Sequence, residues 1–153
     1  MKLSPILSLV FLLPLFGCIT GAAVTTGDRV TIEYTAAVLN HTFDKGATSF
    51  IVGKHEVIPG VEAGVIGMKI GEEKTFTVPP ALAYGEYNES FLIRIDTRLF
   101  NGTRPHLYDK VTLFGRQGMV VNESDEAIIV DLNHWLAGQE ITFHVKVLNI
   151  EKP

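Results

Sequence analysis

The chain has 153 residues, of which 46% are hydrophobic and 20% are charged, and its formal net charge at pH 7 is -4. A chain of this length can bury one modest core together with one small satellite domain. The negative net charge does not favour nucleic acid or an anionic membrane surface as a partner. We therefore expect a small globular protein that binds no nucleic acid.

Residues 1–22 have the composition of an export leader. One early lysine precedes an apolar run from Ile6 to Phe16, and small residues follow around Cys18. This order is typical of a secretory signal. Pro14 and the shortness of the run argue against a stable spanning helix, which needs about 20 apolar residues. The sequence thus predicts a signal or lipoprotein-type leader over residues 1–22.

Cys18 is the only cysteine, so no disulfide can form within this sequence. Its place directly after Leu15, Phe16 and Gly17 resembles a prokaryotic lipobox, in which the cysteine becomes a lipidated N-terminus. An uncleaved N-terminal membrane anchor and simple secretion stay open as alternatives. All three predict an exported protein, either secreted or held at the extracytoplasmic face of the cell membrane.

Asparagine-linked glycosylation is the second indication of export. Of the six asparagines, four begin an N-x-S/T sequon: Asn40, Asn88, Asn101 and Asn122. The alternative is coincidence in polar turns, where Asn, Ser and Thr gather in any case. Together with the leader, the sequons favour a glycosylated outer surface. Glycosylation combined with a lipobox favours an archaeal source.

Strand patterns near both ends of the remaining chain frame one helix. Residues 59–68 are the expected helix, because proline suits a first helical turn and Gly67 or Gly71 can end it. Gly60, Gly64, Gly67 and Gly71 would share one face and let the helix lie close to a sheet, although glycine makes it intrinsically weak. Alternating apolar and polar residues predict strands over 29–39, 74–80 and 140–151, and a short apolar run predicts another over 49–52. The expected fold class is α+β, an antiparallel β-sheet wrapped around one short helix.

The pattern changes between Glu86 and Asp131, where strand-like pieces alternate with sequons and turns. Residues 110–114, 118–121 and 127–132 are the three strand candidates. This composition predicts a small inserted β domain over residues 88–132. The core domain is then residues 24–87 together with residues 133–153.

The glycine-rich segment 51–72 raises the question of a phosphate-binding loop. Lys54 follows Gly53, but His55 occupies the place that a serine or threonine needs, and no glycine lies five residues before Gly53. The histidines are scattered without an H-x-x-x-H pair or a cysteine partner, so surface histidines are the simpler interpretation. No G-x-S-x-G occurs, whereas paired-carboxylate chemistry stays open on spacing alone. We expect no metal and no cofactor.

An apolar site is what remains. Aromatic and branched residues gather at the ends of the segments, and the simplest alternative is that they only form a core. Tyrosines favour a site, because buried tyrosines need partners for their hydroxyl groups. The residues concerned are Tyr34, Phe43, Phe50, Val57, Ile58, Val61, Tyr84 and Phe143.

Three segments in a fixed order carry a resemblance to a known family. They are VTIEYTAAVLN followed by TFD, then FIVGKHEVIPGVEAGVIGMKIGEEKTFTVPPALAYG, then VDLNHWLAGQEITFHVKVLNIE. This order resembles the FKBP family of peptidyl-prolyl cis-trans isomerases, and within it the SlyD-like branch of bacteria and archaea. That branch carries an insert-in-flap chaperone domain between the A-Y-G motif, here residues 83–85, and an N-H-x-L-A-G segment, here residues 133–138. The resemblance covers residues 27–153.

The resemblance implies a role for each pocket residue. Tyr34, Asp44 and Tyr84 would be catalytic: Tyr84 would donate to a substrate carbonyl, and Asp44, hydrogen-bonded through Tyr34, would lie beside the twisting amide. The amide of Ile58 would hold a second carbonyl. The substrate-binding residues would be Phe43, Thr48, Val57, Ile58, Val61 and Phe143, with Lys54, His55 and Glu56 at the rim.

Several departures from the family pattern bear on activity. Thr48 stands where an apolar or aromatic wall residue is usual, and the sequon at Asn40 would place a glycan near the pocket rim. The insert is shorter than usual and is expected to lack one strand. No histidine- or cysteine-rich tail follows Ile150, so the nickel binding of some relatives is not implied.

The implied partners are unfolded or partly folded proline-containing polypeptides, which the insert of relatives captures at a sheet edge. Here seven insert residues could form the capture surface or equally the insert's own core: Val111, Leu113, Phe114, Met119, Val120, Ile128 and Ile129. The sequence analysis therefore predicts a monomeric, exported prolyl isomerase and chaperone. A non-catalytic holdase on the same scaffold is the alternative, and a surface adhesion domain is a third.

Overall fold

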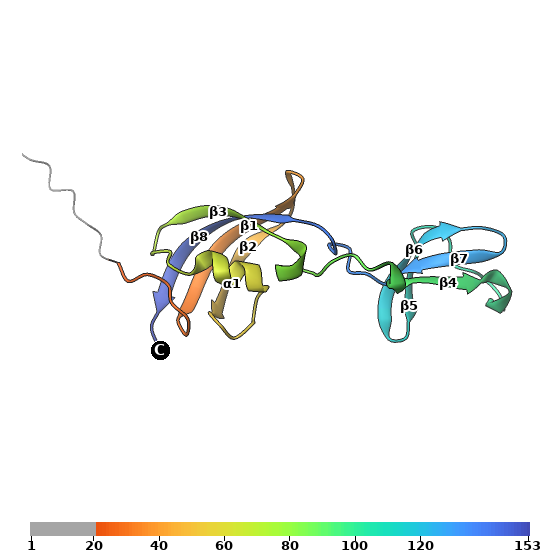
Figure 1. Ribbon diagram of the computed structural model, residues 1–153, viewed down its shortest axis with the longest axis horizontal. Coiled ribbons are helices and arrows are strands. Elements are labelled where there is room, and N and C mark those ends of the chain that lie inside the picture. The colour runs from red at the N-terminus through yellow and green to blue at the C-terminus, as the bar shows by residue number, and fades with distance from the viewer. Residues whose placement is uncertain (1–20) are drawn as a thin grey trace, which may run out of the picture.

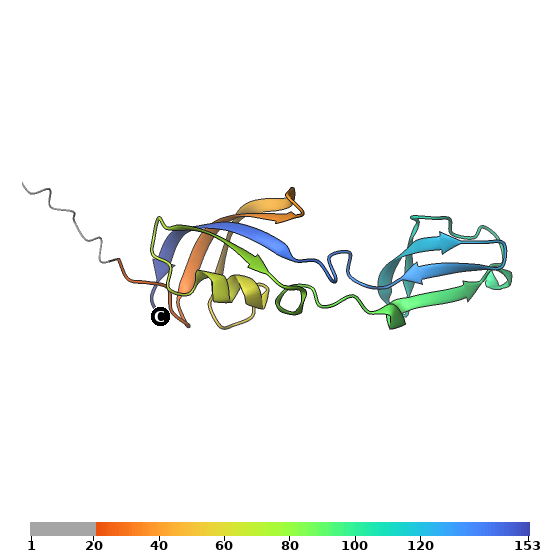
Figure 2. The ribbon, with the colours of Figure 1, turned by 45° about the horizontal axis from the view of Figure 1, so that its top comes forward.

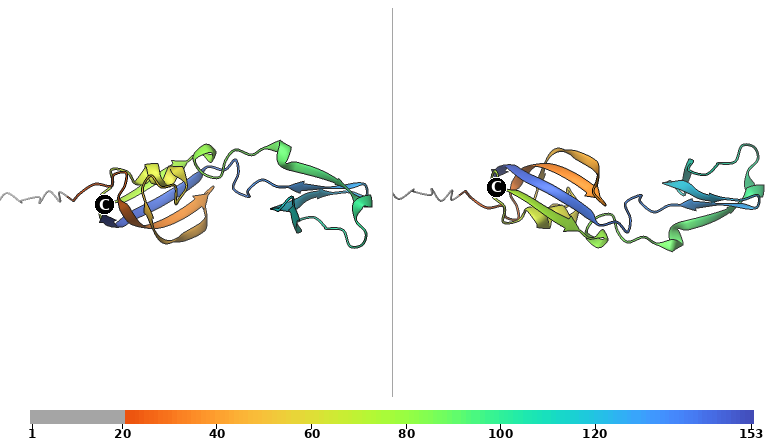
Figure 3. Two further views of the ribbon diagram at one scale, coloured as in Figure 1. Left: turned by 90° about the horizontal axis from the view of Figure 1, so that it is seen from below. Right: turned by 90° about the horizontal axis from the view of Figure 1, so that it is seen from above.

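The computed structural model describes residues 21–153, so Cys18 and the leader up to residue 20 lie outside the described residues. Two four-stranded antiparallel sheets lie at opposite ends of an elongated molecule, joined by two connecting segments (Figures 1 and 2). Views from below and above show the same separation of the two sheets (Figure 3). No helix within residues 21–153 is long and apolar enough to cross a membrane.

The first sheet has the strand order β2-β1-β8-β3, with the one α-helix of residues 21–153 packed on one face (Figure 1). Its strands are β1 (Arg29–Val38), β2 (His41–Ile51), β3 (Glu73–Val78) and β8 (Ile141–Glu151). The predicted strand at 49–52 was too short, since β2 begins at His41 and pairs along the whole of β1. Most side chains of β2 between His41 and Ser49 are exposed on this edge strand, which is why the hydrophobic pattern missed them.

The helix α1 (Pro59–Val65) is shorter than the predicted 59–68. It presses on β3 through two glycines: a Cβ on Gly60 would lie 2.1 Å from Val78 Cγ1, and one on Gly64 would lie 2.2 Å from Phe76 Cζ. This confirms the expected close approach of helix and sheet. Gly67 and Gly71 instead form turns with positive φ beyond the helix, so the prediction that all four glycines share one helical face was wrong.

The core of this domain lies between the sheet and α1. Most of the alternating apolar residues of the strands are buried there, including Val30, Ile32, Ile141 and Val145. The segment before β1 belongs to the same core, because Val24 is buried and exchanges backbone hydrogen bonds with Gly67 and Met68. Lys152 Nζ lies 2.7 Å from Asp28 Oδ2. This ion pair, which we call the clamp, joins the segment after β8 to the segment before β1.

The insert forms the second sheet, with the order β4-β7-β6-β5. Its strands are β4 (Leu92–Asp96), β5 (Lys110–Leu113), β6 (Arg116–Glu123) and β7 (Ala127–Asp131). The sequence analysis missed β4. Every residue of β4 except the exposed Arg94 is half-buried, so no sharp apolar alternation marks it. The short 3-10 helices are η1 (Pro80–Leu82), η2 (Glu89–Phe91) and η3 (Thr97–Leu99).

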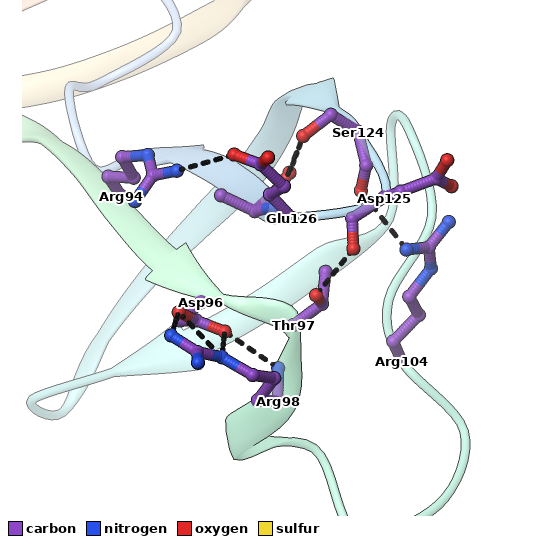
Figure 4. A network of polar contacts seen from close by, with 9 residues as sticks. Arg94, Asp96, Thr97, Arg98, Arg104, Ser124, Asp125 and Glu126 are labelled. Atoms are coloured by element: carbon purple, nitrogen blue, oxygen red, sulfur yellow. Dashed lines mark hydrogen bonds and ion pairs between the residues drawn. The ribbon is translucent and has the colours of Figure 1, made fainter.

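A polar network closes the far end of the insert (Figure 4). Arg98 Nη2 lies 2.6 Å from Asp96 Oδ2, and this hydrogen-bonded guanidinium holds the pKa of the Asp96 carboxyl well below its usual range. Thr97 Oγ1 donates to the carbonyl of Asp125 at 2.7 Å, and Arg104 Nη1 donates to the carbonyl of Ser124 at 3.1 Å. These bonds fasten β4 and η3 to the β6–β7 turn.

Candidate active site

A pocket of about 510 Å³ opens between the first sheet, α1 and the segment that connects to the insert. It brings together all nine residues that the sequence analysis named as catalytic or substrate-binding. Four further residues line it, namely Ile32, Ala36, His55 and Glu56. The full set is Ile32, Tyr34 and Ala36 of β1; Phe43, Asp44 and Thr48 of β2; His55, Glu56, Val57 and Ile58 of the β2–α1 loop; Val61 of α1; Tyr84; and Phe143 of β8.

The deep part of the pocket is apolar and firmly packed. Val61 and Phe143 are both buried, and Phe143 stacks on Phe76 with the ring centroids 6.0 Å apart. Phe76 is the residue that meets Gly64 of the helix, so the close approach of α1 also fixes this wall. Tyr34 packs against the other side of Phe143 at 6.5 Å. Such walls exclude water from whatever group enters between them.

Tyr34 and Asp44 form the main polar pair in the pocket. The Tyr34 hydroxyl donates to Asp44 Oδ2 at 3.0 Å, which confirms the hydrogen bond that the resemblance implied. The bond to the carboxylate raises the pKa of the Tyr34 hydroxyl above its ordinary value, and partial burial adds to the effect. The hydroxyl therefore stays protonated and holds the Asp44 carboxylate at the pocket wall. The catalytic roles of these residues and of Tyr84 stay predictions.

Two carboxylates hold the loop between β2 and α1. Glu62 is buried on α1 and accepts a hydrogen bond from the amide of His55 at 2.9 Å, and Glu56 accepts from the amide of Ile51 at 3.1 Å. His55 has a positive φ of 57°, a conformation that such a bond helps to hold. His55 and Glu56, expected at the rim, line the pocket, whereas Lys54 does not.

The amide of Ile58 is placed to bind a carbonyl group. Ile58 precedes the first residue of α1 and lines the pocket. Its own carbonyl accepts from the amides of Val61 and Glu62, and within residues 21–153 its amide donates no hydrogen bond. A free amide at a helix start is a ready donor to an incoming oxygen.

Aromatic rings continue from the pocket onto its rim. Tyr84, which is 39% exposed, stacks on the imidazole of His134 with the centroids 4.2 Å apart and the planes 2° apart. The next residue, Trp135, contacts Phe43 edge-on at 5.3 Å. The sequence analysis used His134 and Trp135 only as landmarks and missed this contact with the site. The available sequence signal for this contact was that His134 and Trp135 lie shortly before the predicted strand 140–151.

The remaining site predictions concern Thr48 and surface modification. Thr48 lies in the pocket wall, so the polar wall position expected from the sequence is present. Asn40 is exposed at the β1–β2 turn with a φ of 66°. The other three sequon asparagines, Asn88, Asn101 and Asn122, are exposed as well. Residues 21–153 contain no cluster of three or more His, Cys, Asp or Glu side chains that could hold a metal ion.

An apolar pocket with one tyrosine–carboxylate pair, set between an antiparallel sheet and a short helix, defines a protein that binds a small apolar group. Residues 21–147 match the model of the FKBP-type peptidyl-prolyl cis-trans isomerase family. The chain belongs to this family.

Individual relatives agree with this assignment. A short-type peptidyl-prolyl cis-trans isomerase of Methanocaldococcus jannaschii is 36% identical over 104 residues, which cover 67% of this chain and 66% of the relative. The FKBP-type peptidyl-prolyl cis-trans isomerase SlyD of Helicobacter pylori is 30% identical over 122 residues, covering 75% of this chain and 65% of the relative. The chain thus spans just under two thirds of the length of these relatives.

A solved structure is also similar to this chain. The crystal structure of FkpA from Escherichia coli matches with a TM-score of 0.48 and 20% sequence identity, covering 86% of this chain and 44% of that one.

Proposed function

We propose that the protein catalyses cis-trans isomerisation of peptidyl-prolyl bonds and assists the folding of other chains. The observation that carries the proposal is the apolar pocket in which Tyr34 and Asp44 form the main polar pair. Relatives that bear the name peptidyl-prolyl cis-trans isomerase support it.

The pocket suits this reaction because the reaction breaks no covalent bond. The barrier of about 18–20 kcal/mol comes from amide resonance, so neither a nucleophile nor a metal is needed. A dry apolar cavity disfavours the planar, charge-separated amide, and fixed dipoles can favour the twisted form. Val61 and Phe143 would hold the prolyl ring, while the Ile58 amide and the Tyr84 hydroxyl would donate to substrate carbonyls. Asp44 would face the rotating bond.

The insert would supply the chaperone activity. Four of the seven apolar residues considered for capture pack in the insert's own core: Val120 and Ile128 are buried, and Val111 and Leu113 lie against them. Ile129 is half-buried, and Phe114 and Met119 are exposed. We propose that these two, at the β5–β6 hairpin, contact unfolded chains, and that the free edge of β5 pairs with them.

We further propose that the protein acts outside the cytoplasm. The leader-like residues 1–22 and four exposed sequon asparagines support this location. Mass spectrometry of the native protein would test it: a lipidated Cys18 at the N-terminus supports lipid anchoring, and hexose mass on Asn40, Asn88, Asn101 or Asn122 supports export. An intact, unmodified N-terminus and unmodified asparagines would contradict it.

The decisive experiment is proline-limited refolding of a model protein. Wild-type protein should accelerate the slow phase, and both Tyr84→Ala and Asp44→Ala should reduce the acceleration by about tenfold, the loss expected for one interaction of about 1.4 kcal/mol in the transition state. Leu148→Ala, an exposed apolar substitution on β8 outside the pocket, is the matched control. No acceleration by the wild type would refute the isomerase proposal.

The same assay tests the alternative function. A holdase on this scaffold would suppress aggregation of the unfolded model protein without accelerating its slow refolding phase. Thr48 favours this alternative, because a hydroxyl in the pocket wall makes the pocket less apolar. Thr48→Leu should then raise catalysis if the wall polarity is what limits it.

A further inference from the structure

Four aromatic rings form a continuous surface that leaves the pocket on the side of the insert. Tyr84 stacks on His134, His134 lies 6.2 Å from Trp135, and Trp135 meets Phe43 edge-on. Tyr84 and Phe43 also line the pocket, whereas His134 and Trp135 lie outside it. We call these four residues the aromatic ledge.

The ledge is exposed and open to a ligand. Trp135 is 67% exposed although it is a large apolar side chain, and His134 is exposed beside it. Singly exposed apolar residues are ordinary, but this one continues an aromatic wall of a binding pocket. Tryptophan and tyrosine are the residue types that most often dominate binding energy at protein interfaces.

The ledge is also rigid. The imidazole Nδ1 of His134 accepts a hydrogen bond from the amide of Leu136 at 3.2 Å, so the neutral ring carries its proton on Nε2. The carbonyl of His134 accepts from the amide of Ala137 at 2.8 Å. Leu136 and Ala137 are buried in turn. A ring surface fixed in this way loses little freedom when a ligand covers it.

The position of the aromatic ledge indicates which part of a substrate polypeptide it would contact. His134 and Trp135 belong to the connection between β7 and β8, which runs between the two domains (Figure 2). A polypeptide with its proline in the pocket and a neighbouring part on the insert can lie along this connection. Flat aromatic faces favour stacked or edge-on contact with another aromatic ring.

We infer that the aromatic ledge is a specificity subsite for an aromatic side chain of the substrate, one or two residues from the proline on the side that leads to the insert. This inference rests on the proposed isomerase function and deepens it. Trp135, which is 67% exposed, is its main specificity residue.

The test compares short proline peptides that carry phenylalanine or alanine at each of the two positions before and after the proline, with isomerisation rates measured by NMR exchange. Trp135→Ala should lower kcat/KM by about three- to tenfold for the peptides whose phenylalanine reaches the ledge, the effect of losing one aromatic pair. The all-alanine peptide should be unaffected. Trp135→Phe should restore most of the loss, and Tyr108→Ala, an exposed aromatic of the insert, should change nothing.

Trp135 also reports binding directly, since it is the only tryptophan in the chain. A phenylalanine peptide that reaches the ledge should shift its fluorescence emission to the blue, and the all-alanine peptide should not. An equal loss on all peptides in Trp135→Ala would assign Trp135 to packing on Phe43 alone and overturn the inference, as would no loss on any peptide. If the wild type accelerates no peptide, the proposed function itself fails.

Discussion

The side-chain amide of Asn133 pairs with the backbone of Asn88 in both directions. Asn133 Oδ1 accepts from the Asn88 amide at 3.0 Å, and Asn133 Nδ2 donates to the Asn88 carbonyl at 3.0 Å. The pair joins the two segments that connect the isomerase domain to the insert. Asp131 holds Asn133 from the insert side, since its Oδ1 accepts from both the amide and Nδ2 of Asn133 at 2.8 Å. Its Oδ2 accepts from the Tyr87 hydroxyl at 2.9 Å. These hydrogen bonds of Asn133 and Asp131 hold the two connecting segments together, and we call them the latch.

Removing the latch should separate catalysis on peptides from action on unfolded proteins. In Asn133→Ala both side-chain bonds to Asn88 are lost while the Tyr87–Asp131 bond remains, so the insert is held less firmly in one direction relative to the pocket. Two linked sites gain from each other only when their geometry allows simultaneous binding. We expect kcat/KM on a short proline peptide within about twofold of wild type, and acceleration of proline-limited protein refolding to fall by about tenfold.

The control for this prediction is Asn149→Ala, which removes an exposed asparagine side chain of β8 that donates a hydrogen bond to Glu151. Small-angle scattering of both variants would measure the spread of domain separations, which should widen for Asn133→Ala alone. Equal loss on the peptide and on the protein would show that Asn133 stabilises the pocket itself rather than the direction of the insert.

The Tyr34–Asp44 pair predicts a shifted tyrosine titration. The carboxylate that accepts the hydroxyl proton raises the pKa of Tyr34, so the folded protein keeps this proton at a pH where an ordinary tyrosine, with a pKa of 10.0, is half ionised. The ultraviolet difference titration between wild type and Tyr34→Phe isolates this residue. Asp44→Asn should move its midpoint down towards 10, because the negative acceptor is removed.

The same pair predicts a kinetic effect. Tyr34→Phe should lower kcat/KM on proline peptides by about ten- to hundredfold, in line with the roughly 1.5–3 kcal/mol of a hydrogen bond to a charged group. Tyr108→Phe, a substitution on the insert outside the pocket, is the control. Phe50→Tyr is unsuitable as a control, because Phe50 is buried in the core. Unchanged kcat/KM in Tyr34→Phe would remove Tyr34 from the catalytic group.

The contact of Gly60 with Val78 predicts an unfavourable alanine substitution in a helix. Alanine normally stabilises a helix relative to glycine by about 1 kcal/mol. At Gly60 the new Cβ would lie 2.1, 2.8 and 3.0 Å from three atoms of the Val78 side chain, and rotation of that side chain would still leave its own Cβ at 3.0 Å. We expect a net loss of about 1–3 kcal/mol in the free energy of unfolding, measured by urea titration. Gly46→Ala, where no atom lies within 4 Å, is the control, and a stabilised Gly60→Ala would contradict the packing described.

The sequence predicted the architecture wherever local pattern and tertiary burial agree. The strands β1, β3 and β8 alternate because one face of each meets the core, and the glycines of α1 indicated how closely it packs. The sequence analysis missed most of the edge strand β2 and all of the insert strand β4, because the sheet pairing that orders them leaves many of their side chains exposed or half-buried. Their position depends on backbone hydrogen bonds to neighbouring strands, which side-chain periodicity does not record.

The residues of the candidate site were likewise predicted only in part. The resemblance named nine pocket residues because the family motif places them along the chain. It missed Ile32 and Ala36, which belong to the same inward face of β1 as Tyr34, and this omission was avoidable from the alternation alone. The stacking of His134 on Tyr84 was not predictable, because it depends on how the connection from the insert returns to the pocket. A contact between residues that are 50 positions apart leaves no local pattern.

The clamp between Asp28 and Lys152 predicts how stability depends on pH. Asp28 is buried, and the hydrogen bond from the Lys152 ammonium, followed by that from the Thr25 amide, holds the pKa of its carboxyl below the ordinary value of 3.8. A carboxyl whose pKa is lower in the folded than in the unfolded protein stabilises the fold above the unfolded pKa. That contribution is lost as the pH falls through the folded pKa.

Lys152→Met should therefore lower Tm at pH 7, and the difference from wild type should shrink as the pH falls below 3.8, the ordinary aspartate value. Lys110→Met, at an exposed lysine of β5, should show no such pH-dependent difference. Thermal unfolding of the three proteins between neutral and acid pH measures the effect. A Tm difference that stays constant across the range would mean that Lys152 acts through packing of its methylene chain on the N-terminal segment, because only the charge of Asp28 links the clamp to protons.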